Sequence, residues 1–227
     1  MYSIIQAAGW PIWALLATSV IALALVIDRL IALRRDRVLP SGLLNRVLVD
    51  YNQHGFPPEA LRTLATGSAL GQVLSAGIRN RHATRASMRE AIEEEGRAVA
   101  HDLSRFVGAL ATVAAIAPLM GLFGTVIGMI EIFGAQSPAG ANPQQLAHGI
   151  SVALYNTAFG LIIAVPAMIF SRYFRAVVEG HVVELERQSA KLVNVLQVER
   201  RSRTTELGLT PDSARSGAGS SSVQSGS

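Results

Sequence analysis

Two threonines and one glutamate are the side chains that we single out first in this chain of 227 residues. Thr125, Thr157 and Glu131 lie within residues 106–171, which contain no Lys or Arg, although the chain has 20 of these residues elsewhere. Counted from the outer ends of their apolar segments, both threonines are expected about 14 Å below the same membrane surface. Their hydroxyls could then form a polar ring if several copies surround an axis. Alternatively, each hydroxyl bonds to a carbonyl one turn earlier in its own helix.

Other reactive groups are sparse. Glu131 is the only acidic residue in 106–171, and it lies near the outer end of its segment, where a carboxylate can reach water at little cost. His148, at the entrance of the next apolar segment, could titrate near neutral pH, but a lone histidine there is more often solvated. The sequence has no Cys and no HExxH, GxSxG or phosphate-binding loop. We therefore expect no enzyme activity, no metal site and no disulfide.

Small residues recur at helical spacing in both apolar segments. Such stripes allow two helices to approach closely, and packing within one subunit is their simplest explanation. Pro118 and Pro166 lie in the same segments and are expected to bend the helices and release backbone carbonyls. The stripes consist of Ala117, Gly121, Thr125 and Gly128, then Gly149, Ala153, Thr157, Gly160 and Ala164.

The elements that must position these residues are membrane helices. Half of the residues are hydrophobic, and three apolar runs, 10–28, 106–134 and 147–171, are long enough to cross a hydrocarbon core of about 30 Å. The first run could be a cleaved signal peptide, but no Lys or Arg precedes it, so we favour a retained span. The sequence thus predicts an all-α integral membrane protein with three transmembrane helices and long cytoplasmic helical extensions.

The charges predict the orientation. Four arginines follow the first span directly, so residues 1–9 should lie outside and 29–105 in the cytoplasm, N-out and C-in. An outer loop at 135–146, a cytoplasmic helix at 172–207 and a disordered tail at 208–227 complete the layout. The net charge of +4 indicates contact with the lipid membrane and does not suggest nucleic-acid binding. The four arginines are Arg29, Arg34, Arg35 and Arg37.

Helical periodicity continues outside the spans. Apolar residues from Met88 to Leu103 predict one helix from about 86 to 134, and Val178 to Val195 predict a helical extension of the third span. The apolar stripe of this extension could pack against the helix at 86–105 or against another subunit. Residues 38–82 read as short surface helices.

The segments APLMGLFGTVIGMIEIF and GISVALYNTAFGLIIAVPA closely resemble the two signature segments of the ExbB/TolQ/MotA proton-channel family. The resemblance covers about 87–175, and the three-span layout is similar to the ExbB and TolQ branch. It implies a homopentamer in the bacterial inner membrane around single-span partners of the ExbD/TolR type, whose membrane Asp carries protons. It also implies that proton-motive force, with no cofactor, drives work on a TonB-like or TolA-like protein. Thr125 and Thr157 match the family's pore-lining threonines.

One position departs from the family pattern. An acidic residue commonly precedes the second threonine by five positions, and here that position is Val152. Glu131, at a similar depth on the neighbouring helix, is our hypothesis for a replacement in the proton path; Glu131→Gln would then lower proton-driven function with assembly intact. Val152 also favours the alternative of a non-conducting scaffold that holds partner helices. A permease subunit of an ATP-driven transporter would require more spans.

Overall fold

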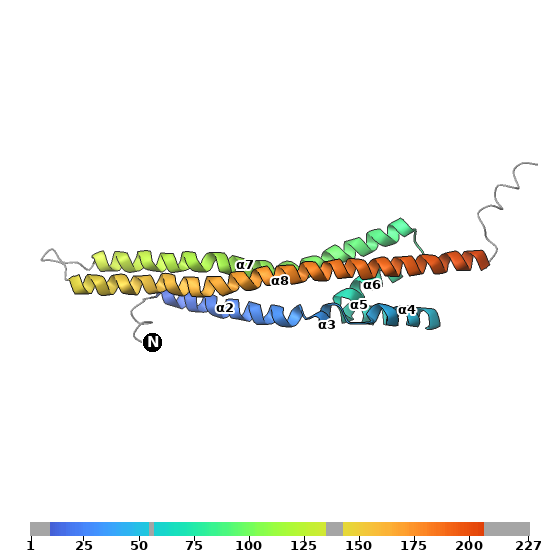
Figure 1. Cartoon of the computed structure of the whole chain (residues 1–227), viewed down its shortest axis with the longest axis horizontal. Helices are drawn as coiled ribbons and strands as arrows, with labels where there is room; N and C mark the ends of the chain where they lie inside the picture. Colours follow the sequence, from blue (N-terminus) through green and yellow to red (C-terminus); the bar gives the residue numbers. More distant parts are fainter. Residues whose placement is uncertain (1–9, 55–56, 135–142, 207–227) are drawn as a thin grey trace, which may run out of the picture. The chain divides into compact units, whose positions relative to one another are not determined.

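The structure is a computed structural model, and it describes residues 10–54, 57–134 and 143–206. These residues form seven helices and no strand (Figure 1). Three of the helices, α2, α7 and α8, are long and apolar enough to cross a membrane, which confirms the predicted all-α membrane fold. The predicted N-out, C-in orientation stays a prediction. The termini 1–9 and 208–227 and residues 135–142 of the outer loop lie outside the described residues. The helices are α2 (Pro11–Ala32), α3 (Arg35–Val38), α4 (Leu43–His54), α5 (Pro58–Gly67), α6 (Ala69–Arg79), α7 (Arg85–Gly134) and α8 (Pro143–Glu206).

The chain divides into two compact units, and α7 and α8 contribute to both. The first unit contains the chain up to Pro40 and Arg97–Val183, and the second contains Ser41–Gly96 and the chain from Glu184 onward. The helix predicted from about 86 to 134 is observed as α7. The third span and the predicted cytoplasmic helix form one uninterrupted helix, α8, with Pro166 inside it.

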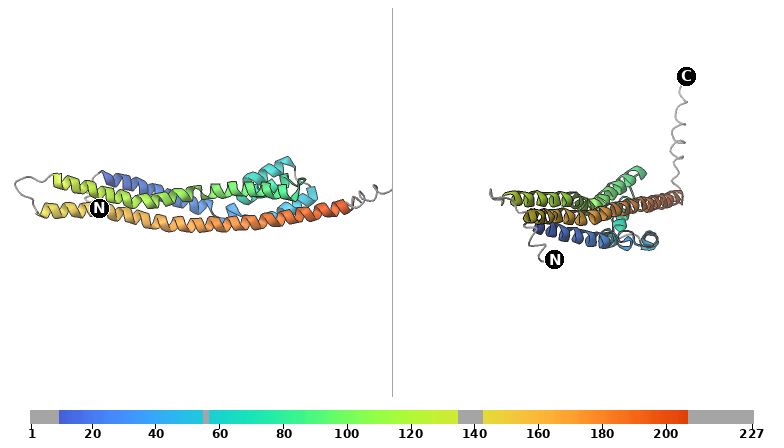
Figure 2. Two further views of the ribbon diagram at one scale, coloured as in Figure 1. Left: turned by 90° about the horizontal axis from the view of Figure 1, so that it is seen from above. Right: turned by 60° about the vertical axis from the view of Figure 1, so that its left-hand side comes forward.

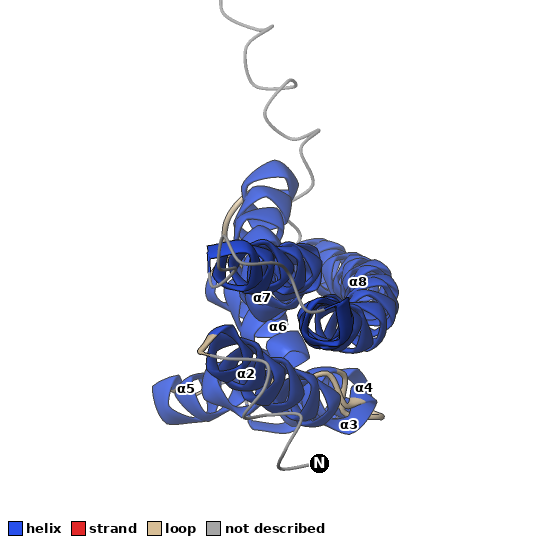
Figure 3. Ribbon diagram, turned by 90° about the vertical axis from the view of Figure 1, so that its left-hand side faces the viewer, coloured by secondary structure: helices blue, strands red, loops and turns tan. Residues whose placement is uncertain are grey.

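In the first unit, α2, α7 and α8 lie side by side, at the corners of a triangle when seen end-on (Figure 3). α7 and α8 run antiparallel along this unit (Figure 2). Each helix presents apolar side chains to a shared core, whereas many of its other large apolar residues stay exposed, as expected of a surface that meets lipid or other subunits. The buried core consists of Ala22, Val26, Leu33, Val107, Leu110, Ala114, Ala167, Phe174 and Val178.

Two buried polar side chains fasten the end of α2 to its neighbours. Arg29 is 7% exposed; it pairs with Asp28 at 2.8 Å and donates to the Leu103 carbonyl of α7 at 3.4 Å. His181 of α8 places Nε2 3.0 Å from the carbonyl oxygen of Leu33, the residue after α2. Because this oxygen can only accept, Nε2 carries the hydrogen and donates it. The last turn of α2 is therefore bound to both long helices.

The second unit corrects the expectation of short surface helices for residues 38–82. α4 and α5 are partly exposed, but α6 is buried along most of its length, including Leu74 and Ser75. A methyl group at Gly77 would lie 2.9 Å from the Ile92 side chain and 3.0 Å from that of Leu192. Ile92 of α7 and Leu192 of α8 thus pack against the chain's own α6. At Leu192 the stripe packs within the chain, but its observed partner is α6 and not the helix at 86–105 that the first alternative named.

Candidate functional site

The closest helix contact in the first unit is a seam between α7 and α8 that depends on glycines. A methyl group at Gly121 would lie 2.7 Å from the Asn156 carbonyl oxygen and 3.0 Å from the Thr157 Cα. One at Gly160 would lie 2.6 Å from the Ala117 carbonyl oxygen. Real Cβ atoms essentially never approach other atoms this closely, so the two backbones touch where only glycine leaves room.

The seam continues toward the outer ends of the helices with less severe contacts. A methyl group at Gly128 would lie 3.3 Å from the Ala153 Cβ, so this position is tight but not blocked by backbone. At Gly149, the same group would lie 2.5 Å from the side chain of Ile132, which can move. The approach between α7 and α8 is therefore tightest around Gly121 and Gly160.

Asn156 is a polar residue in the seam that sequence reasoning passed over. It is 1% exposed, and its amide side chain lies against Gly124, where an added Cβ would be 3.0 Å from Nδ2. Intramembrane polar residues are costly and commonly functional, so an Asn inside an apolar run was a usable signal. Gly124 lies three residues after Gly121 and four before Gly128, so the same helical spacing could have placed it on the seam.

The two threonines lie on one side of the seam. At about 100° per residue, Thr125 is rotated about 40° from Gly121, and Thr157 is rotated about 60° from Gly160 in the same sense. Since the helices are antiparallel, equal senses of rotation bring both residues to the same side of the pair, which we call the threonine flank. Both side chains are partly buried in the single chain.

Along the helix axes the threonines are not level. Gly121 lies opposite the Thr157 Cα, so Thr125 is about one turn, or 6 Å, farther out than Thr157. The expectation of a common depth counted residues from the ends of the apolar segments, and those ends are not level. Because each Cβ tilts toward the N-terminus of its helix, the two antiparallel side chains lean toward each other and reduce this offset.

The hydroxyl of Thr125 donates to the Leu122 carbonyl at 2.6 Å. This bond is the local alternative considered for a membrane threonine, and it leaves the oxygen able to accept another hydrogen bond. Thr112 makes the equivalent bond to the Gly108 carbonyl at 3.1 Å on the side of α7 that faces away from the seam. A hydroxyl bonded to its own helix is thus not unique to the threonine flank.

Glu131 lies on the other side of the seam. It is rotated about 80° from Gly121 in the sense opposite to Thr125. The Met120 sulfur lies 3.6 Å from the Thr18 hydroxyl oxygen of α2, which marks this side as the one that α2 occupies; we call it the α2 flank. The single chain therefore separates Glu131 from the two threonines. Its role in a proton path stays a prediction.

The two prolines that the sequence analysis singled out lie inside the long helices. Pro118 and Pro166 lie inside α7 and α8, and Pro118 has no N–H for the Ala114 carbonyl one turn earlier. Pro118 is rotated about 60° from Gly121 toward the threonine flank. The side chains of His148 and Val152 lie outside the described part of the structure, although both residues belong to α8.

The α2 helix has the length and the end residues of a membrane span. Trp10, just before α2, meets Phe123 of α7 edge-on with ring centroids 6.2 Å apart. From Trp10 to Arg29 the chain rises about 28 Å, close to the thickness of a hydrocarbon core. An exposed tryptophan at one end and an arginine at the other match the usual boundaries of a membrane span.

These features define a helical membrane protein with three candidate spans and a glycine seam flanked by hydroxyls. Residues 65–187, more than half of the chain, match the MotA/TolQ/ExbB proton channel family. The chain therefore belongs to this family, as its two signature segments indicate.

Individual relatives place it near the ExbB and TolQ branch. An ExbB-like biopolymer transport protein of Synechocystis sp. is 28% identical over 183 residues, which are 78% of this chain and 86% of that protein. The biopolymer transport protein ExbB of Pseudomonas putida is 32% identical over 121 residues, 53% of this chain and 37% of that protein. The Tol-Pal system protein TolQ of Haemophilus influenzae is 52% identical over 60 residues, 26% of each. The chain thus spans well under two thirds of the last two proteins.

Proposed function

We propose that this chain is the channel subunit of a complex that uses proton-motive force to do work on a TonB-like or TolA-like protein. The observation that carries the proposal is the glycine seam with Thr125 and Thr157 on one flank. The ExbB and TolQ relatives, named for biopolymer transport and the Tol-Pal system, support it. One charge crossing 100 mV releases about 2.3 kcal/mol, enough to drive a conformational step.

The assembly that we propose is a homopentamer in the bacterial inner membrane, with its N-terminus in the periplasm. The threonine flanks of the five copies face the central axis, where single-span ExbD/TolR-like partners bind and present an acidic residue. The exposed apolar residues of α7 and α8 support contacts with lipid and with neighbouring copies. The protein needs no cofactor and catalyses no covalent reaction.

Native mass spectrometry of the complex, gently extracted from its own membranes, tests the assembly. We expect five copies of this chain together with a small single-span protein that has an Asp in its span. A monomer, or a complex with an ATPase, would contradict the proposal.

Proton flux into proteoliposomes that contain the purified complex tests conduction. Thr157→Val keeps the shape of the side chain but removes the hydroxyl from the threonine flank. We expect the proton flux to fall at least about tenfold if that hydroxyl contributes one charge-assisted hydrogen bond. Thr112→Val is the matched control, since Thr112 is exposed on the opposite side of α7. Equal flux for both variants would refute the role of Thr157.

A second candidate function is a non-conducting scaffold that holds partner helices at the same central axis. The observation that favours it is Val152 at a position where the family commonly has an acid. A complex of full stoichiometry with no proton flux above that of empty liposomes would support the scaffold.

A further inference from the structure

Two arginines share one aromatic ring at the end of the first unit's apolar region. The guanidinium carbon of Arg29 lies 4.7 Å from the centroid of the Phe106 ring, and that of Arg105 lies 4.8 Å from it. Both distances are within the range of a cation–π interaction. The two side chains come from α2 and α7, so the ring gathers cations from two helices.

In the part of the chain that the structure describes, only one of these two charges is paired with a carboxylate. Arg29 is buried and paired with Asp28 at 2.8 Å. Among the described residues, no carboxylate lies within 4.0 Å of the Arg105 guanidinium. A second, unpaired cation beside a buried ion pair raises the local positive potential, which an anion bound to Arg105 would lower.

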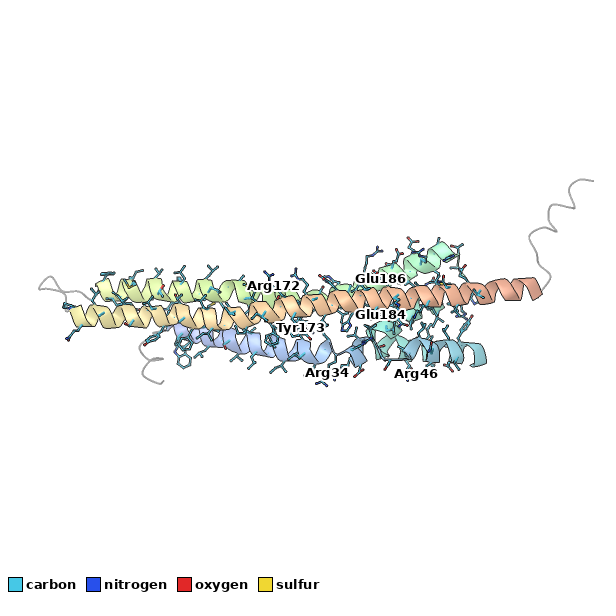
Figure 4. All side chains as sticks on the ribbon, in the orientation of Figure 1. Arg34, Arg46, Arg172, Tyr173, Glu184 and Glu186 are labelled. Atoms are coloured by element: carbon cyan, nitrogen blue, oxygen red, sulfur yellow. The ribbon has the colours of Figure 1, made fainter. Side chains whose placement is uncertain are left out.

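The residues around Arg105 also carry more positive than negative charges. The part of the first unit at this end, residues 28–40, 97–105 and 172–183, contains eight arginines and four carboxylates. Arg34, between α2 and α3, and Arg172 and Tyr173 on α8 belong to this region (Figure 4). The α7–α8 seam fixes their levels: Ala117 lies opposite Gly160, so Arg105, twelve residues before Ala117, lies level with Arg172, twelve residues after Gly160.

The apolar surface begins directly beside this cluster. Phe106 is the first residue of the long run without Lys or Arg, and it is 36% exposed. Ile27 and Leu30 of α2 are exposed one turn or less from Arg29. A ligand that reaches both surfaces must combine an anionic group with hydrocarbon chains.

We propose that Arg105 and Phe106, beside the Arg29–Asp28 pair, form a binding site for the headgroup phosphate of an anionic phospholipid. The Phe106 ring holds the Arg105 guanidinium by one face, and its N–H donors, which lie in the guanidinium plane, remain available for phosphate oxygens. The acyl chains extend along the exposed apolar residues of α2 and α7. The site does not depend on proton conduction. The orientation proposed above would place it in the cytoplasmic leaflet.

Lipid retention measured by native mass spectrometry on the full complex tests the site. The detergent-solubilised complex is incubated with phosphatidylglycerol or with phosphatidylcholine, and the lipids that stay bound are counted. We expect the wild-type complex to retain phosphatidylglycerol preferentially and Arg105→Gln to weaken this retention about tenfold, the loss of one charge-assisted hydrogen bond.

Three controls make the result specific. Arg46→Gln removes the same charge from α4, which belongs to the second unit, and should leave retention unchanged. Arg105→Lys keeps the charge but not the planar donors, and it should bind less than the wild type and more than Arg105→Gln. If Arg105→Gln assembles poorly, this lysine variant alone decides the question.

Three results would overturn the proposal. The first is equal retention of the two lipids by the wild-type complex. The second is equal retention of phosphatidylglycerol by Arg105→Gln and Arg46→Gln, or by Arg105→Lys and the wild type. The third is full displacement of phosphatidylglycerol by millimolar inorganic phosphate, because the site would then bind a free anion without using the apolar surface.

Discussion

Replacing Gly121 by alanine tests the close approach of α7 and α8 most directly. The new Cβ would lie 2.7 Å from the Asn156 carbonyl oxygen, whereas ordinary contact begins at 3.4 Å. The backbones must therefore separate by about 0.7 Å, which weakens dispersion contacts along the whole seam. Overpacking of this kind costs about 1–3 kcal/mol. Against it stands a gain of about 1 kcal/mol, because alanine is a better helix former than glycine.

Gly108→Ala supplies the matched control on the same helix. Gly108 is exposed, and an added Cβ would have no atom within 4 Å. This variant keeps the gain in helix propensity without the contact, so the difference between the two variants isolates the cost of separating the helices. We expect Gly121→Ala to be less stable than Gly108→Ala by about 1–3 kcal/mol.

Reversible unfolding in mixed detergent micelles, followed by circular dichroism, measures both free energies of unfolding. If the two variants shift the unfolding midpoint by the same amount, the backbones do not approach at Gly121 as the structure has them. Gly160→Ala, where the nearest atom would be the Ala117 carbonyl oxygen at 2.6 Å, should repeat the effect from the other helix.

Two further predictions concern polar contacts outside the seam. His181→Ala removes the hydrogen bond to the Leu33 carbonyl, and the same unfolding assay should show a loss of about 1–3 kcal/mol, whereas His181→Gln, which can donate, should recover part of it. Gln188→Leu removes the 2.7 Å hydrogen bond that is the main cause of the lowered pKa of Glu184, so an NMR titration should find this pKa raised toward its ordinary value of 4.5. A carboxyl group whose pKa is lowered by folding stabilises the protein above its unfolded-state pKa and loses this effect as the pH falls through the folded-state pKa. The stability difference between wild type and Gln188→Leu should therefore shrink as the pH drops below about 4.5, and a constant difference would contradict this account.

The three long helices could be predicted from the sequence because the membrane imposes a simple rule. Charges are costly in hydrocarbon, so runs without Lys or Arg mark the spans. Gly121 and Gly160 could be found in the same way, because small residues at helical spacing align on one face. The same periodicity does not say which neighbour a face meets. The contact of α6 with Ile92 and Leu192 could be found only from the tertiary structure.

The position of each polar residue along the helix axis, and the flank of the seam on which it lies, were harder to predict. Counting residues from segment ends placed Thr125 and Thr157 at one depth, but only an actual contact, such as Gly121 against Thr157, fixes the register of two helices. Asn156 was overlooked beside Thr157, although the two residues point to different flanks of the seam. Arg29 was taken as a signal of orientation, and its burial against Leu103 depends on how α2 packs.

The short hydrogen bond from Thr125 to the Leu122 carbonyl has a consequence for what the hydroxyl can recognise. The hydroxyl has a single hydrogen, and it is already committed at 2.6 Å. In this state the oxygen offers lone pairs alone, so a group that approaches it must bring its own hydrogen. A carboxylic acid or a water molecule meets that requirement, and an ionised carboxylate does not. In the proposed complex, Thr125 would thus favour the protonated form of a partner's acidic residue over the charged form, which makes it a selector of protonation state.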